Sequence, residues 1–220
     1  MTRYITIDGT DGSGKTTLLS NLYYYLAKHL EYTVLETKEF GSKHDKACQD
    51  IRSIILNSNY KVTNLAMQLG FASIIAQHHE KVINPARESG MYNYILSDRG
   101  IDSNYAYAPA HGLDDEQINS IFDTAYRDFK LPEVTIFLNI DPELAFSRRR
   151  TRDPEKFIDG GTDAVEAKGI ELQYKVRENF LEMAKGNDRI KVIDVTPDKT
   201  PEDILNEALL ILGELPDEAA

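Results

Sequence analysis

A short run of residues near the start of the chain has the types and the spacing of a phosphate-binding loop. It reads Gly9-Thr10-Asp11-Gly12-Ser13-Gly14-Lys15-Thr16 and fits G-x-x-x-x-G-K-[ST] at every fixed position. The glycines let backbone N–H groups point at phosphate oxygens, and a following helix adds the positive end of its dipole. A plain glycine-rich turn would need neither Lys15, which can reach β- and γ-phosphates, nor Thr16, whose hydroxyl can ligate Mg²⁺. We therefore expect this loop and the adjoining Thr17 to bind ATP.

An acidic and a basic residue stand together where a predicted strand ends. Asp98 follows the strand-like run at 92–97, the place where enzymes with such a loop present a carboxylate to Mg²⁺ or its waters. We expect Mg²⁺, brought in with ATP, as the cofactor, held by Thr16 and Asp98; a helix cap is the alternative for Asp98. Arg99 carries a fork of donors that matches a phosphate. Its alternative is an ion pair with Asp98 or Asp102.

A basic segment later in the chain has the composition of a closing lid, which we place at about residues 148–165. The basic run is followed by turn signals, Asp153-Pro154 and Asp159-Gly160-Gly161. Its cations would stabilise the charge of a transferred phosphoryl group, unless they form only a solvated helix end. The candidates are Arg149, Arg150, Arg152 and Lys156.

Short strand-like runs alternate with longer helical patterns, which is typical of a parallel sheet covered by helices. Strands are expected at residues 3–8, 33–37, 92–97, 134–140 and 190–195. Helices are expected at residues 15–30, 43–57, 63–88, 114–129, 142–151, 165–185 and 201–213, with Asp114 and Pro201 at helix starts. The prediction is an α/β protein: a three-layer α/β/α P-loop fold with a five-stranded parallel sheet, formed by residues 1–220 as a single domain.

The net charge of the chain limits its partners. Asp and Glu number 36 against 25 Lys and Arg, a formal net charge of −11, which argues against a nucleic-acid polymer held by a broad basic surface. Small-molecule nucleotides, met by a few local cations, are the expected partners. No apolar run approaches the roughly 20 residues that cross a bilayer, and no signal-peptide pattern precedes the first strand. We therefore expect no membrane contact and a cytoplasmic location.

Several short motifs, in order along the chain, resemble those of the thymidylate kinase family. The phosphate loop is similar to G-x-[DE]-G-[AS]-G-K-[ST], and Thr37-Lys38-Glu39-Phe40-Gly41 resembles T-R-E-P-G. Residues 51–56 resemble L-R-x-L-L-L, residues 71–78 resemble F-A-A-D-R-A-Q-H, and residues 98–107 resemble D-R-Y-x-x-S-[NS]-x-A-Y. In the lid, residues 163–166 look like D-R-x-E. Each motif is weak apart from the phosphate loop, but together they are specific and cover nearly the whole chain.

The resemblance implies an acceptor nucleotide and residues that hold it. Arg99 would bind the acceptor's α-phosphate, and Asp11 would lie near the sugar 3′-hydroxyl and the phosphate, unless Asp11 only shapes the turn. Lys38 and Arg52 are candidates for the same phosphate, with solvated surface cations as the alternative.

Aromatic and amide side chains would hold the rest of the acceptor. Phe71 would stack on the base and Tyr107 would lie under the deoxyribose, although an aromatic residue such as Phe71 is more often part of a core. Asn104 offers a donor and an acceptor to a base edge. In one subgroup of the family an arginine stands in the phosphate loop, and in another the lid supplies it. This loop has none between Gly9 and Gly14, so the chain looks like the second subgroup.

The sequence departs from the family pattern in the base pocket. Ile75 occupies the acceptor-pocket position of the family's base-reading arginine, and Ile74 that of the preceding acid. An unpaired polar base edge costs roughly 1 to 3 kcal/mol. Gly100 replaces a large ring and Ala108 replaces a frequent Gln, which predicts a roomier pocket. Loose acceptance of dTMP, or a related deoxynucleotide with another base, is therefore expected.

The predicted reaction transfers the γ-phosphoryl group of MgATP to a deoxynucleoside monophosphate, with dTMP as the leading acceptor, giving dTDP and ADP. A nucleoside kinase is the second hypothesis; it would need a carboxylate base, for which Asp11 and Glu39 are the candidates, and would leave Arg99 unexplained. A non-catalytic ATP-binding module is the third. The family commonly forms dimers, and the resemblance implies a homodimer, with the helix at 63–88 as the place to look.

Overall fold

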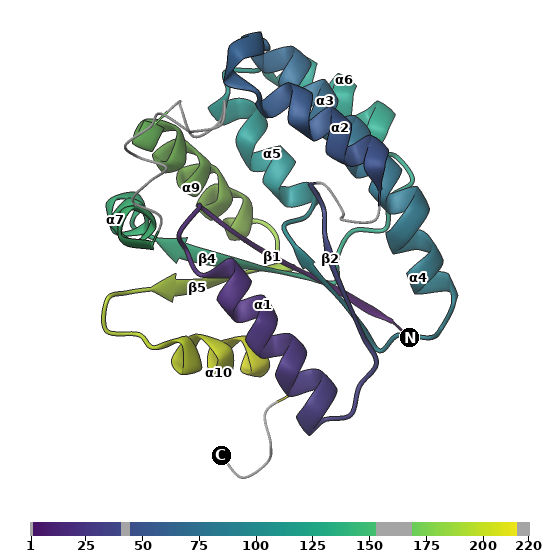
Figure 1. Ribbon diagram of the computed structural model, residues 1–220, viewed down its shortest axis with the longest axis vertical. Coiled ribbons are helices and arrows are strands. Elements are labelled where there is room, and N and C mark those ends of the chain that lie inside the picture. Colours follow the sequence, from purple (N-terminus) through teal and green to yellow (C-terminus); the bar gives the residue numbers. More distant parts are fainter. Residues whose placement is uncertain (1, 41–44, 153–168, 215–220) are drawn as a thin grey trace.

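The computed structural model describes residues 2–40, 45–152 and 169–214. A parallel sheet with strand order β2-β3-β1-β4-β5 lies at its centre (Figure 1). The strands are β1 Arg3–Gly9, β2 Val34–Lys38, β3 Tyr94–Asp98, β4 Val134–Ile140 and β5 Ile190–Val195. Every pairing between neighbours is parallel. The predicted α/β class and five-stranded parallel sheet are thus confirmed.

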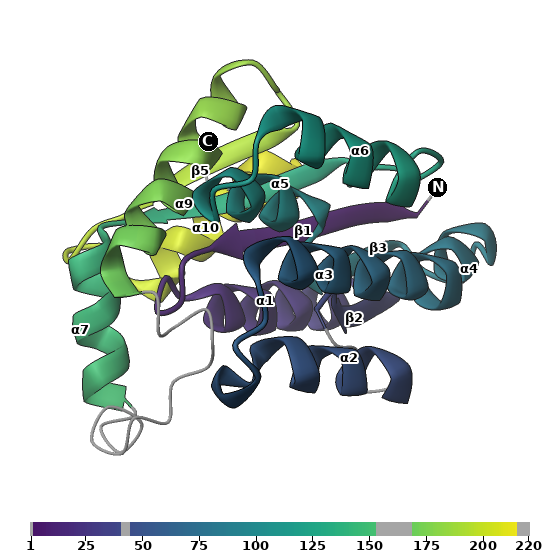
Figure 2. The ribbon, with the colours of Figure 1, turned by 90° about the horizontal axis from the view of Figure 1, so that it is seen from above.

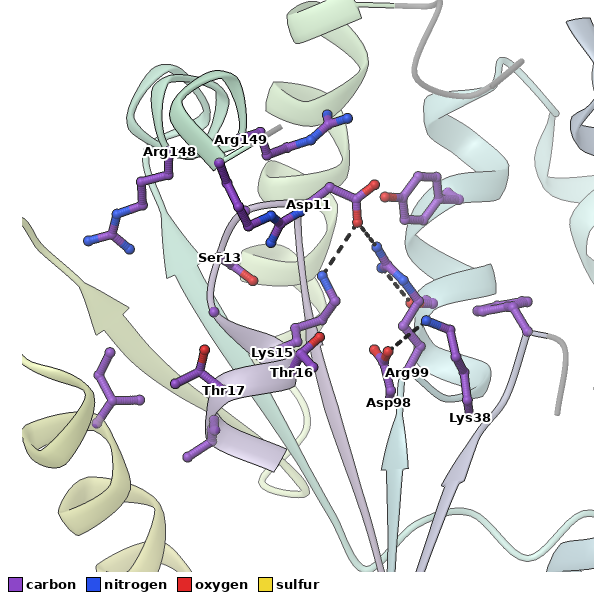
Figure 3. A pocket seen from close by; sticks show the side chains of 18 of the residues that line it. Asp11, Ser13, Lys15, Thr16, Thr17, Lys38, Asp98, Arg99, Arg148 and Arg149 are labelled. Atoms are coloured by element: carbon purple, nitrogen blue, oxygen red, sulfur yellow. Dashed lines mark hydrogen bonds and ion pairs between the residues drawn. The ribbon is translucent and has the colours of Figure 1, made fainter. Parts of the chain in front are cut away.

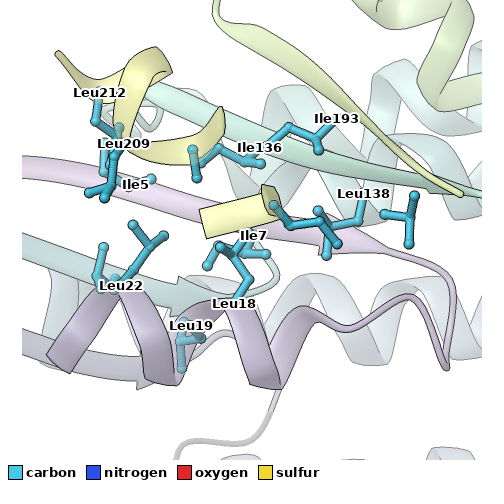
Figure 4. Close-up of a cluster of buried hydrophobic side chains, with 14 of the residues drawn as sticks. Ile5, Ile7, Leu18, Leu19, Leu22, Ile136, Leu138, Ile193, Leu209 and Leu212 are labelled. Carbon is cyan, nitrogen blue, oxygen red and sulfur yellow. The ribbon is translucent and has the colours of Figure 1, made fainter. Parts of the chain in front are cut away.

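Helices cover both faces of this sheet, which explains why β1 and β3 are nearly continuous buried runs. On one face α1 (Lys15–Tyr24) and α10 (Pro201–Leu212) pack on Ile5, Ile7 and Leu138 (Figure 4). On the other face α9 (Gly169–Lys185) brings Phe180 onto Phe137, with ring centroids 4.4 Å apart. Figure 2 shows α5, α6 and α9 on one side of β1 and α1 on the other.

The remaining helices lie near the expected positions. The expected helix at 63–88 is one continuous rod: α3 (Asn64–His78), a π turn η3 (His79–Ile83) and α4 (Asn84–Glu88). A second π turn, η1 (Tyr25–His29), extends α1, and η2 is the short 3₁₀ helix Ser58–Tyr60. The others are α2 (Lys46–Leu56), α6 (Asp115–Ala125) and α7 (Pro142–Arg152). Asp114 caps α6 through Gln117, and Pro201 stands in the first turn of α10, both as predicted.

One helix was not predicted from the sequence. Helix α5, Ile101–Ala110, follows β3 directly and buries polar residues, among them Asp102, Ser103 and Asn104. It contains Pro109 near its end and has no single apolar face, so its pattern lacks the period that identifies a surface helix. Its buried polar side chains instead contact the sheet: Ser103 donates to Asp8 of β1, and Asp102 accepts from Thr135 of β4.

Among residues 2–40, 45–152 and 169–214, no helix combines the length and the apolar character needed to cross a membrane.

Candidate functional site

The carboxyl ends of three neighbouring strands meet at one edge of the sheet. Asp98 at the end of β3 is the register partner of Ile7 in β1 and of Lys38 in β2. This is the edge where ligands bind in open parallel sheets. A pocket of about 490 Å³ opens there (Figure 3). Among the residues around it are Asp11 to Leu18, Lys38, Phe40, Arg52, Leu56, Phe71, Asp98, Arg99, Ser103, Asn104, Tyr107, Arg148, Arg149, Arg152, Lys199, Pro201 and Ile204.

The phosphate loop needs glycine at positions where the backbone is left-handed or crowded. Gly14 caps α1 with φ 101°, a conformation that L side chains rarely adopt. Gly12 has φ 94°, and a Cβ there would lie 2.4 Å from the carbonyl oxygen of Ala145 in α7. The close approach of loop and helix therefore requires Gly12. It also places Arg149, the predicted lid residue on α7, beside the loop.

Lys15 lies inside the loop and is ready to exchange its partners for an anion. Its Nζ donates to the carbonyl oxygens of Gly9 and Thr10, at 2.9 Å each, and lies 3.5 Å from the Asp11 carboxylate. Burial lowers the pKa of Lys15 to about 8, with Arg99 acting in the same direction and nearby carboxylates opposing it. A phosphate beside Lys15 would raise this pKa and further favour the charged ammonium form.

Two hydroxyls of the loop are buried without a partner. Within the described part of the chain, no hydrogen bond reaches Thr10 Oγ1 or Ser13 Oγ. Buried polar atoms are seldom left unpaired unless a ligand or water completes them. Thr16 and Thr17 are exposed and line the pocket, where their hydroxyls are accessible.

Arg99 links the phosphate loop to the acceptor side of the pocket. Its Nη2 donates to Asp11 at 2.7 Å and its Nη1 to Ser103 Oγ at 3.3 Å, while its guanidinium lies 5.6 Å from the Tyr107 ring centroid. Burial would raise the pKa of Asp11, but Arg99, Lys15 and Arg149 outweigh it and hold that pKa well below its usual range. The expected alternative partners of Arg99 were Asp98 and Asp102. The structure pairs it with Asp11 instead, and Asp102 pairs with Arg189 at 2.7 Å.

Asp98 has one oxygen in use and one available. Lys38 Nζ donates to Asp98 Oδ2 at 2.8 Å, so two residues that the sequence analysis assigned to different ligands form an ion pair. Burial would raise the pKa of Asp98, but Lys38, Lys15 and Arg99 lower it below its usual range. Its other oxygen, Oδ1, is buried and has no partner among the described residues. A buried, ionised, half-satisfied carboxylate beside the phosphate loop fits the oxygen ligands that Mg²⁺ prefers.

The far end of the pocket is partly aromatic. Phe71 lines it and meets Phe40 edge to face, with ring centroids 5.1 Å apart. Asn104 also lines it, and its Nδ2 donates to the Tyr126 hydroxyl at 2.7 Å. Tyr107 and Arg52 complete the set of acceptor candidates at the pocket wall.

Two expected site residues lie away from the pocket. Ile75 is fully buried in a hydrophobic cluster with Phe40 and Ile101, and it is not part of the pocket lining. Arg150 is exposed and also absent from the lining. Of the predicted lid at 148–165, only residues 148–152 are described; Lys156 and the other residues from 153 onward lie outside the described residues.

Sequence reasoning missed several residues that line the pocket, notably Phe40, Ser103, Arg148 and Lys199. Arg148 had a usable signal, since helical residues at i, i+1 and i+4 share a broad face while i+2 points away. That geometry selects Arg148, Arg149 and Arg152 and leaves out Arg150, as the structure does. Ser103 also had a signal, since it stands at the fixed serine of the motif at residues 98–107. Lys199 had no comparable signal.

The second carboxylate considered as a base is not at the pocket. Glu39 is fully buried, accepts a hydrogen bond from the Tyr4 hydroxyl at 2.9 Å, and lies 3.1 Å from His79 Nε2. The adjacent His78 points to a different partner, the Thr37 hydroxyl, at 3.1 Å. Glu39 is therefore placed to link the end of β2 to β1 and η3 rather than to meet a substrate.

The sequence of this chain is similar to the sequences of known thymidylate kinases over most of its length. A family model described as thymidylate kinase matches residues 7–207. The thymidylate kinase of Maridesulfovibrio salexigens is 33% identical over 207 residues, 93% of this chain and 92% of that protein. The thymidylate kinase of Acholeplasma laidlawii is 36% identical over 194 residues, 87% of this chain and 90% of that protein.

A solved structure shows the same fold. The crystal structure of thymidylate kinase from Ehrlichia chaffeensis has a TM-score of 0.69, covering 96% of this chain and 98% of its own, at 24% identity. The matched residues run from β1, through the phosphate loop and the Asp98-Arg99 pair, into α10. Because the similarity includes the elements that build the pocket, the chain belongs to the thymidylate kinase family.

Proposed function

We propose that this enzyme transfers the γ-phosphoryl group of MgATP to dTMP, giving dTDP and ADP. The observation that carries the proposal is the 2.7 Å contact between Asp11 and Arg99, which joins a phosphate-binding loop to a second anion site within one pocket. An ATP-binding module would need only the loop. A kinase for a phosphorylated acceptor needs both sites side by side, because the two reactants must be held in line.

The donor half consists of the phosphate loop and α7. Backbone N–H groups of the loop, together with Lys15, would bind the β- and γ-phosphates. Thr16 and Asp98 would hold Mg²⁺, which neutralises phosphate charge when bound. Arg148, Arg149 and Arg152 share the pocket-facing side of α7 and would stabilise the charge of the transferred group. Gly12, packed on α7, favours Arg149 as the nearest of them.

The acceptor half begins at Arg99. With Lys38 and Arg52 it would bind the acceptor phosphate, while Tyr107 would lie under the deoxyribose and Phe71 on the base. The acceptor phosphate is already ionised near neutral pH, so no general base is needed. The work of the protein is then positioning and charge neutralisation.

A nucleoside kinase fits the pocket less well. Such an enzyme needs a free carboxylate to accept the proton of a 5′-hydroxyl. Asp11 is committed to Arg99 and Lys15, and Glu39 is buried away from the pocket. Arg99 would moreover have no substrate phosphate to bind.

A broader choice of acceptor base is supported by the position of Ile75. Its side chain is buried against Phe40 and gives the pocket no donor for a base carbonyl. We therefore propose dTMP as the leading acceptor, with a weaker preference over other deoxynucleoside monophosphates than a buried arginine would give.

A coupled assay of ADP release tests these proposals. Turnover is measured with ATP and Mg²⁺ plus dTMP, dUMP, dGMP, dCMP, dAMP or thymidine, and without any acceptor. Turnover with dTMP and none with thymidine or without acceptor is expected. Thymidine turnover would instead support the nucleoside kinase, and no acceptor-dependent turnover would support a binding module. Preference for dTMP over dCMP above about ten-thousandfold would contradict the loose base pocket, because dCMP lacks the O4 carbonyl and a pocket that hydrogen-bonds this carbonyl rejects such an analogue by about 10⁴-fold or more.

We also propose a homodimer formed through α2 and α3, and a cytoplasmic location, where ATP is the ordinary phosphoryl donor. Large apolar side chains are exposed on these helices: Ile54 in α2, and Leu65 and Leu69 in α3. Light scattering after gel filtration tests the dimer. Leu69→Lys should shift the mass toward a monomer, while Leu210→Lys, at a more exposed leucine on α10, should not.

All described strands join one sheet, which supports the proposal that the chain forms a single domain.

A further inference from the structure

Asp8 is a buried carboxylate that none of the roles above uses. It stands near the end of β1, directly before the phosphate loop, and its side chain is fully buried. Its Oδ1 accepts a hydrogen bond from the Ser103 hydroxyl of α5, and its Oδ2 has no partner among the described residues. Such a carboxylate is costly to bury, so its presence calls for an explanation.

The hydrogen bond from Ser103 to Asp8 determines that Ser103 accepts, rather than donates, in its hydrogen bond with Arg99. A serine hydroxyl has a single proton to donate and lone pairs to accept with. When that proton goes to the ionised Asp8, the Ser103 oxygen faces Arg99 Nη1, 3.3 Å away, only as an acceptor. Arg99 Nη1 also lies 3.9 Å from Asp8 Oδ1, within the reach of its charge.

The backbone at Arg99 is fixed in position, so only the Arg99 side chain needs further contacts to orient it. Arg99 has φ 71°, unusual for a residue with a side chain, and its N–H donates to the Ile7 carbonyl at 2.9 Å. The next residue, Gly100, packs so closely on β1 that a Cβ would lie 2.6 Å from Thr6 Cγ2. The turn is therefore fixed against β1, and the guanidinium is held by Asp11 on one side and by Ser103 on the other.

We propose that Asp8 is a positioning residue that orients the Ser103 hydroxyl and thereby holds the Arg99 guanidinium in place for the acceptor phosphate. This role rests on the proposed function of Arg99. Asp8 touches neither nucleotide in this scheme; it acts through Ser103.

Charges around Asp8 agree with a pairing to Arg99. The nearby Asp102 already has its own cation, since both of its oxygens accept from Arg189, at 2.7 Å each. Burial raises the pKa of Asp8 to about 7, and Arg99 and the Ser103 hydrogen bond act against that rise. Asp102 adds to it and Lys15 opposes it. Tyr4, Tyr107 and Arg189 are more distant groups that also interact electrostatically with Asp8.

The experiment compares Asp8→Asn, Ser103→Ala and the double variant at pH 8 by steady-state kinetics. Wild-type turnover of dTMP is measured first, because its absence would overturn the proposed function and not the role of Asp8. Each single variant should raise KM for dTMP about tenfold, the value of one hydrogen bond to a charged group, and change KM for ATP less than about twofold. The double variant should be no worse than Ser103→Ala, because both changes break the same relay.

Asp102→Asn is the matched control. It makes the same chemical change in the neighbouring buried carboxylate, which holds Arg189 and not Arg99. It should lower the midpoint of thermal unfolding and leave KM for dTMP unchanged. An equal rise of both KM values in Asp8→Asn, additive effects in the double variant, or the same kinetic defect in Asp102→Asn would overturn the role of Asp8. If Asp8→Asn does not fold, Ser103→Ala alone tests the proposal. An unchanged KM for dTMP in Ser103→Ala would then overturn the role of Asp8.

Discussion

Asp11 and Arg99 meet at 2.7 Å, carboxylate to guanidinium. Asp11 belongs to the phosphate loop after β1, and Arg99 to the turn after β3, the neighbouring strand. The pair places the donor and acceptor phosphates of the proposed reaction next to each other. The Asp11 side chain is 42% exposed, so solvent partly screens the ion pair and its contribution to the free energy of unfolding is small. Its main role is to position the Arg99 guanidinium.

Asp11→Asn should therefore reduce catalysis without much loss of stability. The amide lacks the charge that holds Arg99 Nη2, so kcat/KM for dTMP should fall about 10- to 100-fold, as expected for one charge-assisted hydrogen bond. The midpoint of urea unfolding should shift little. Kinetics and urea unfolding on the same preparation measure both. A large stability loss with unchanged kcat/KM would show that the pair is structural.

Lys15→Ala should abolish phosphoryl transfer and leave the fold intact. Lys15 bonds to the loop's own carbonyls, and its removal leaves the donor phosphates without this positive charge. We expect kcat to fall at least about a hundredfold, as for the loss of a preorganised group at developing charge. Circular dichroism should match the wild type. Lys46→Ala, at a highly exposed lysine on α2, is the control and should retain full activity.

Asp98→Asn should change the requirement for Mg²⁺. Its Oδ1 has no partner among the described residues, and an amide is a weaker ligand for a hard cation. The concentration of Mg²⁺ that gives half-maximal rate should rise about tenfold or more. Titration of the rate with Mg²⁺ at saturating nucleotides measures this. Lys38→Met removes the partner of Asp98 Oδ2 but leaves Oδ1, so the Mg²⁺ requirement should change less. Equal shifts in the two variants would argue against Asp98 as a ligand.

Asp8 should make stability depend on pH. Burial raises its pKa from 3.8 to about 7 in the folded protein. Between these values the folded state holds a proton that the unfolded chain has lost, so this group lowers the free energy of unfolding as pH rises from about 4 to 7. Asp8→Asn lacks the group. Its free energy of unfolding relative to wild type should therefore increase from pH 5 to 7 and then level off. Urea unfolding at pH 5, 6, 7 and 8 measures the difference, and a constant difference would contradict the raised pKa.

Local patterns in the sequence determined much of this protein. The phosphate loop was predictable because its chemistry depends on residues adjacent in the chain, with glycines where the backbone requires them. The strands were predictable because buried parallel strands are short apolar runs, and the ends of β4 and β5 match the predicted ranges. Family motifs then indicated Arg99, Phe71 and Asn104, all of which line the pocket.

The tertiary structure alone decided which partners these residues have. Nothing in the spacing of the chain pairs Arg99 with Asp11, 88 positions away, or Ser103 with Asp8, 95 positions away. Helix α5 escaped prediction because its polar residues are buried against the sheet, which removes the apolar period. Ile75 shares a motif with Phe71, and Arg150 follows Arg149 in the basic run, yet neither Ile75 nor Arg150 lines the pocket. The direction of a side chain follows from helix rotation and packing rather than from the sequence pattern. Motifs therefore identified the chemistry, while the register of parallel strands and the packing of α5 and α7 set its geometry.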